Sequence, residues 1–221
     1  MFIGHFAVGL AGRRVAPRAS LGTWFLAVSL VDLLWPIFLL SGLERVRIDP
    51  GNTAFTPLDF THYPITHSIP GGLLWAALLA GIWYSRHRHA RTAALLAAGV
   101  MSPWALDAIS HGPDMPVLPN GPYVGLGLWN SVPVTMIVEG TMFAAAVALY
   151  VRGTRARDRV GKWSLVAMVA FLAVMYVLNV VSPPPPSERA LAYGALLAWL
   201  LVLWPYWIDR HRVDSGAAVD R

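Results

Sequence analysis

The chain has 221 residues, of which 56% are hydrophobic and only 13% are charged, and its mean hydropathy is +0.53. These values lie outside the range of soluble domains and indicate a polytopic membrane protein. The net charge of +5 does not indicate a nucleic-acid partner, because the basic residues form short clusters between apolar runs, as in cytoplasmic membrane loops. The absence of cysteine excludes disulfides, thiolate metal ligands and a cysteine nucleophile.

The apolar segments predict an all-α fold, a polytopic membrane helix bundle with six transmembrane helices and a short N-terminal half-helix. Residues 2–12 are apolar but too short to cross a bilayer, so this half-helix either enters the bilayer or lies on its surface. No basic segment and small-residue cleavage site precede the first arginines, so we expect no cleaved signal peptide. The predicted spans are 21–41, 69–84, 92–111, 130–151, 163–181 and 190–208. We expect residues 1–209 to form a single transmembrane domain and residues 210–221 a polar cytoplasmic tail.

Two of the connecting segments have compositions of their own. Residues 42–68 are polar and rich in charged side chains and histidine. Residues 112–129 hold four prolines and four glycines but no lysine or arginine, which predicts a loop of defined shape.

The distribution of basic residues predicts the orientation. The N-terminal cluster, segments 85–91 and 152–162, and the tail hold 14 of the 17 lysines and arginines, while the alternate segments hold Arg45, Arg47 and Arg189. Six spans with both termini in the cytoplasm agree with the positive-inside rule at every loop. The predicted location is a bacterial-type cytoplasmic (inner) membrane, crossed several times.

The end of the third span carries ionisable residues close together. Asp107 and His111 are four residues apart, so on a helix they share one face. Gly112 and Pro113 then end the helix, and Asp114 follows. Ionisable groups in a membrane segment are costly and usually face a cavity or the interior of a bundle.

Other polar side chains reach comparable depths. With a rise of about 1.5 Å per residue, Asp32 and Glu139 each lie roughly 13 Å from the outer ends of their spans, and Asp107 lies roughly 6 Å from its own. His67 and His111 lie at the outer mouth, and in a half-helix that rises from the first arginines, His5 lies near the middle of the bilayer. We therefore expect these acids and histidines to line one pocket that opens to the outside.

Imidazole and carboxylate groups are the ligands that zinc, manganese or iron accept where no thiolate is present. We predict a divalent metal site, with zinc preferred and manganese or iron as alternatives. A bound metal would favour the charged forms of the acids and activate water. The candidate metal ligands are His5, Asp32, His67, Asp107 and His111. The candidate catalytic groups are Glu139, as general base, with Asp114 and His62 at the mouth.

Short motifs over roughly residues 3–139 resemble the membrane-bound metal-dependent hydrolase family, also described as LexA-binding, inner-membrane-associated hydrolases. Gly4-His5-Phe6 resembles the opening Gly-His of that family, and Asp32 with Pro36 resembles its acidic motif. Thr66-His67-Ser68 matches its Thr-His-Ser element, and His62 stands where a further histidine often precedes that element. Its Ser-His-x-x-x-Asp element is similar to Ser102-Pro103-x-x-x-Asp107, in which proline replaces the histidine and His111 is an alternative nitrogen ligand.

The leading hypothesis is a membrane-embedded metal-dependent hydrolase that acts on a lipid or phosphate-ester substrate at the outer side of the membrane. One alternative is an ion- or proton-coupled transporter or channel, because acids and histidines near the midplane also form relays. Another is a non-catalytic membrane assembly protein whose polar groups only hold its helices together. The expected partners are the lipid bilayer and the substrate, without nucleic acid; a homo-oligomer is compatible with each hypothesis.

Overall fold

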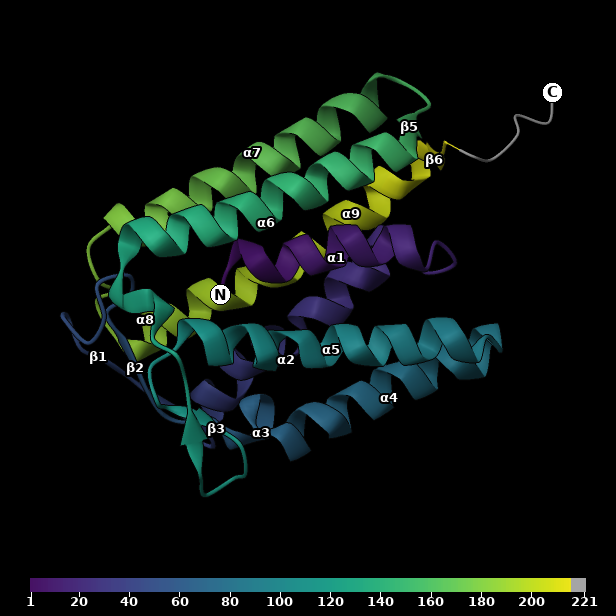
Figure 1. The fold of residues 1–221 in the computed structure, drawn as a ribbon. Coiled ribbons are helices and arrows are strands. Elements are labelled where there is room, and N and C mark those ends of the chain that lie inside the picture. The colour runs from purple at the N-terminus through teal and green to yellow at the C-terminus, as the bar shows by residue number, and fades with distance from the viewer. Residues whose placement is uncertain (216–221) are drawn as a thin grey trace.

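The computed structural model of the protein describes residues 1–215 and is 69% helical. The helices are α1 (Ile3–Val15), α2 (Leu21–Ser41), α3 (Pro64–His67), α4 (Ile69–His87), α5 (Ala90–Ser110), α6 (Val132–Gly153), α7 (Arg159–Val181), α8 (Glu188–Leu196) and α9 (Leu200–Arg210), with 3-10 turns η1 (Leu128–Asn130) and η2 (Leu197–Trp199). Figure 1 shows α6 and α7 on one side of α1, and α4 and α5 on the other. The short helix α1 packs against α6, α2 and α5, so it lies inside the bundle and not on its surface.

Among residues 1–215, five helical segments are long and apolar enough to cross a membrane: α2, α5, α6, α7 and the segment Glu188–Arg210. The structure thus confirms a predominantly helical bundle with several membrane-length helices. Helix α4, which corresponds to the predicted span 69–84, does not reach the same hydropathy because it begins with Pro-Gly-Gly and ends in Trp-Tyr-Ser-Arg-His. The sixth span remains a prediction.

Capping residues lie at the ends of the helices, close to the boundaries that the sequence predicts. The Ser20 hydroxyl accepts a hydrogen bond from the Thr23 N–H (3.0 Å) at the start of α2. Gly42 ends this helix with φ of 77°, a left-handed conformation that glycine adopts without a Cβ clash. The Ser68 hydroxyl accepts from the Gly71 N–H (3.1 Å) at the start of α4. Local capping therefore sets these boundaries.

The last apolar segment, predicted as a span over 190–208, is the membrane-length helical segment Glu188–Arg210. Within it, the 3-10 turn η2 interrupts the α-helix between α8 and α9. The Trp199 indole N–H in this turn donates to the Leu33 carbonyl on α2 (3.2 Å), which holds the turn against the bundle.

Short strands join the segments outside the long helices. They are β1 (Arg45–Ile48) with β2 (Leu58–His62), β3 (Met115–Pro116) with β4 (Tyr123–Val124), and β5 (Thr154–Ala156) with β6 (Arg212–Asp214), each pair antiparallel. The first two pairs lie in the segments 42–68 and 112–129. The predicted tail 210–221 starts at the last residue of α9 and contains β6, which pairs with β5. Its residues 216–221 lie outside the described part of the chain.

Close packing around α1 depends on its glycines. A methyl group added at Gly12 would overlap the ring of Trp24, a buried side chain of α2. Gly9 likewise faces Phe25 and Val28, with 3.2 Å between an added Cβ and each side chain. The small residues therefore let α1 approach α2 closely enough to bring their polar side chains together.

We expect Gly12→Ala to destabilise the protein by about 1–3 kcal/mol, because the indole of Trp24 must move within a packed core. The matched control is Gly81→Ala on α4, where an added Cβ meets nothing within 4 Å. Thermal unfolding in detergent should show a lower Tm for Gly12→Ala and an unchanged or higher Tm for Gly81→Ala. Equal Tm values for the two variants would contradict this account of α1 packing.

Candidate functional site

A cavity of about 280 Å³ lies where α1, α2, α3 and α5 meet, and the five predicted metal ligands all border it. They are His5, Asp32, His67, Asp107 and His111. The five side chains that the sequence places at comparable depths therefore do lie at one cavity. Whether they bind a metal remains a prediction.

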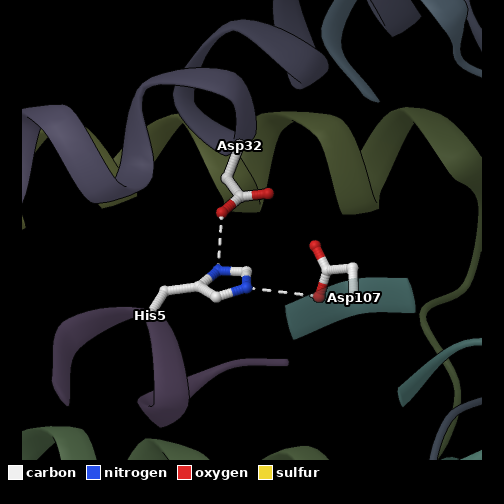
Figure 2. Close-up of side chains that lie close together, drawn as sticks. All are labelled: His5, Asp32 and Asp107. Carbon is white, nitrogen blue, oxygen red and sulfur yellow. Dashed lines mark hydrogen bonds and ion pairs between the residues drawn. The ribbon is translucent and has the colours of Figure 1, made fainter. Parts of the chain in front are cut away.

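The imidazole of His5 lies between two carboxylates (Figure 2). Its Nδ1 is 3.1 Å from Asp32 Oδ2, and its Nε2 is 3.2 Å from Asp107 Oδ1. One possible ligand atom from each residue lies within 4.8 Å of the other two. The backbone nitrogen of Met1 also contacts Asp107 and is 3.1 Å from Ser110 Oγ. Three separate helices therefore deliver two acids and a histidine to one point.

His67 extends this group through Asp32. Its Nε2 is 3.2 Å from Asp32 Oδ1, so each oxygen of the Asp32 carboxylate faces a different imidazole. The Asp32 side chain keeps 40% of its surface exposed because it borders the cavity, whereas the His5 and Asp107 side chains keep only 4% and 3%. Asp32 is thus the carboxylate that a bound molecule in the cavity would meet.

His111 borders the cavity but belongs to a different pair. Its Nδ1 is 3.1 Å from Asp114 Oδ1, and its ring packs against Trp129 and Phe60, with centroid distances of 4.2 and 4.8 Å. Within residues 1–215, the His111 Nε2 makes no hydrogen bond. Asp114 therefore orients the imidazole and leaves one ring nitrogen available.

Glu139 does not border the cavity. Its Oε2 accepts hydrogen bonds from the Phe2 N–H (2.8 Å) and the Gly4 N–H (3.1 Å), at the first turn of α1. Its Oε1 is buried and has no partner in the described part of the chain. The structure therefore places Glu139 as a cap for α1, and its role as general base remains a prediction.

His62 and Pro103 also lie away from this group. His62 is exposed on β2, opposite Arg45, and does not border the cavity. Pro103, which replaces the histidine of the resembled motif, is buried in α5. The imidazole beside Asp107 comes from His5 instead, because α1 packs against α5.

Glu44 and Thr66 belong to the site although the sequence pattern does not predict it. The Glu44 carboxylate is buried and accepts from the Thr66 N–H (2.8 Å), and its second oxygen is 2.8 Å from the Thr66 hydroxyl. That hydroxyl is 2.7 Å from His67 Nδ1. The only signal in the sequence was the position of Thr66 within the Thr-His-Ser element. Glu44 and Thr66 therefore fix the orientation of the His67 ring through its Nδ1, the nitrogen that does not face Asp32.

Comparisons of the chain with protein-family models, with curated proteins and with solved structures found no match.

We expect Glu139→Leu to destabilise the fold strongly, since two buried N–H groups lose their acceptor at a cost of about 1–3 kcal/mol each. Glu139→Gln keeps an acceptor oxygen and should retain most of the stability. Thermal unfolding in detergent compares the two variants. Equal stability of both would contradict the capping role, and loss of hydrolysis in a stable Glu139→Gln would support the general-base role.

Burial raises the pKa of the Glu44 carboxyl above its usual value. The folded state therefore binds this proton more tightly than the unfolded state, so the stabilisation is present at low pH and is lost as pH rises from about 4.3 through the raised pKa. The Tm of Glu44→Gln minus the Tm of wild type should therefore increase as pH rises, because the amide of the variant does not titrate. Glu188→Gln, at an exposed position, is the control. Parallel Tm curves for wild type and Glu44→Gln would contradict the prediction.

Proposed function

We propose that this protein is a membrane-embedded metal-dependent hydrolase that acts on a lipid or phosphate ester from the outer side of the membrane. The observation that supports it best is the convergence of two imidazoles and two carboxylates, from α1, α2, α3 and α5, on one cavity. The resemblance of the Gly-His, acidic and Thr-His-Ser motifs to membrane-bound metal-dependent hydrolases also favours it.

The donor set suits a divalent ion. His5, Asp32 and Asp107 each offer one ligand atom within a 4.8 Å group, while His67 lies outside this group and contacts Asp32. The buried His5 Nε2 lies 3.2 Å from Asp107 Oδ1 without forming a hydrogen bond in the described chain. Mixed nitrogen and oxygen donors fit zinc, with manganese and iron as alternatives. Two acids in an apolar bundle are costly, and a cation in their midst would offset that cost.

A bound divalent ion supplies Lewis acidity at this point. The protein would supply the proton carrier, for which the His111–Asp114 pair is placed better than Glu139. Asp114 holds the Nδ1 side of the ring, so Nε2 can accept a proton from water or donate one to a leaving group in the cavity. The rings of Trp129 and Phe60 cover His111 and limit access of bulk water.

The membrane setting proposed for this site has six spans, with α4 as the sixth. Helix α4 packs along α5, so a span by α5 requires its neighbour to lie in the same layer (Figure 1). The arginine distribution supports cytoplasmic termini in an inner membrane. In that orientation, the end of the bundle where β1, β2 and β3 connect the helices faces outward, and the mouth of the site lies at this end.

Purified protein should bind about one divalent ion or more per chain, and His5→Ala and Asp107→Asn should each weaken binding by at least about tenfold. His62→Ala, at an exposed position outside the cavity, is the matched control and should bind like wild type. Elemental analysis and titration with zinc and manganese measure this. Metal-free protein, or equal binding by all three variants, would contradict the metal site.

A specific observation favours proton transport as a second candidate. A continuous line of polar contacts, each between 2.7 and 3.2 Å, joins six side chains in this order: Glu44, Thr66, His67, Asp32, His5 and Asp107. Such a line is the arrangement of a proton relay. Proton flux into vesicles by metal-free protein, abolished by Thr66→Val and retained by Thr66→Ser, would support this candidate over the hydrolase.

A further inference from the structure

The cavity has a second, apolar character that the polar groups do not use. Apart from the histidines and acids, its wall is mainly aromatic and aliphatic. This wall includes Leu33, Phe55, Leu58, Trp129, Ala198 and Leu201. A cavity with a few convergent polar groups and otherwise apolar walls fits an amphipathic molecule.

The interrupted last segment forms one side of this wall. Ala195, Ala198 and Leu201 all border the cavity and are spaced three residues apart across α8, η2 and α9. In a 3-10 turn, side chains at positions i and i+3 lie nearly above each other, so these residues form a row. Because two of them are alanines, the row leaves space beside the polar groups.

Helices α7 and α8 leave a seam at the same place. Helix α8 packs against α2, and α7 packs against α9, but α7 and α8 do not pack closely on each other. Asn179 on α7 is exposed at the surface of the bundle and also borders the cavity. Nearby, Leu197 is 65% and Val181 is 68% exposed. The cavity wall therefore includes an exposed residue of α7, Asn179, together with Ala195 of α8.

Asn179 is unusual in its surroundings. It is the one strongly polar side chain in the stretch 165–181 of α7, and its amide makes no hydrogen bond within residues 1–215. An amide without a partner in hydrocarbon is costly. An ester or phosphate oxygen of a lipid at the seam would accept its hydrogen bond.

We propose that the seam between α7 and α8 is a lateral opening, through which one hydrocarbon chain of an ester- or phosphate-bearing lipid enters the cavity from the bilayer. The chain lies along the Ala195–Ala198–Leu201 row, and the polar part of the lipid reaches Asp32 and His67. This inference names the substrate class, and for the chemistry it rests on the proposed function. Binding of the hydrocarbon chain, however, can be measured without turnover.

The test uses an ether-linked lysophospholipid that cannot be hydrolysed and carries a diazirine on its chain, added to the full-length protein in bicelles with a chelator. After illumination, wild type should be labelled on peptides that contain Leu33, Phe55 or Leu201. Each methylene excluded from the cavity weakens binding about fourfold. Ala198→Trp, which fills the row, should therefore lose at least about tenfold of this labelling. Leu197→Trp, on the neighbouring exposed position, should keep it.

Equal labelling of the two tryptophan variants, or labelling confined to lipid-facing side chains, would overturn the proposal. A second variant, Asn179→Leu, removes no packing. It should reduce labelling by the lysophospholipid and leave labelling by a diazirine-bearing alkane unchanged. An equal loss of both labels would count against the proposed hydrogen bond from Asn179 to the lipid. Metal titration of wild type and of Ala198→Trp separates the two proposals. If the labelling is as expected but neither protein binds metal, the lipid site stands and the hydrolase proposal is refuted.

Discussion

The Glu139 carboxylate and the first turn of α1 form the contact on which the site depends. The N-terminus of a helix carries unpaired N–H groups and a partial positive charge. Glu139 accepts from two of these groups and so holds the start of α1 inside the bundle. Because His5 is only one residue beyond Gly4, this anchor also places its imidazole between Asp32 and Asp107. Glycines farther along α1 then allow the close approach to α2.

Within residues 1–215, the buried carboxylates of the site contact histidines, Thr66 and the amino group of Met1, and none of them pairs with arginine or lysine. Asp32 faces His5 and His67, and the far side of His67 meets Thr66, which is bonded to Glu44. In a low-dielectric bundle, such a set is stable only when most members have partners. The same dependence favours a fixed arrangement of these side chains, which the proposed metal ion would require.

The proposed chemistry and the proposed lipid opening meet at this cavity. Polar groups come from helices in the first half of the chain, whereas the apolar row comes from the interrupted last segment. An enzyme in a membrane needs both parts, since its substrate arrives from hydrocarbon but reacts at a polar group. The two alanines of this row leave space beside the polar groups, and the Trp199 contact to Leu33 keeps the 3-10 turn attached to α2.

The sequence by itself determined most of the helical segments and the positions of polar residues along them. Apolar runs and capping residues depend on local chemistry, so the predicted span 21–41 coincides with α2, and a constant rise per residue brings His5, Asp32, His67, Asp107 and His111 to one cavity. Rotation of a helix and the identity of its neighbours depend on side-chain packing between distant segments, which a single sequence does not display. Only the tertiary structure therefore decided that Glu139 caps α1, that His62 does not border the cavity and that Glu44 supports His67. It also placed the 3-10 turn of the last segment beside the cavity, where Trp199 contacts α2.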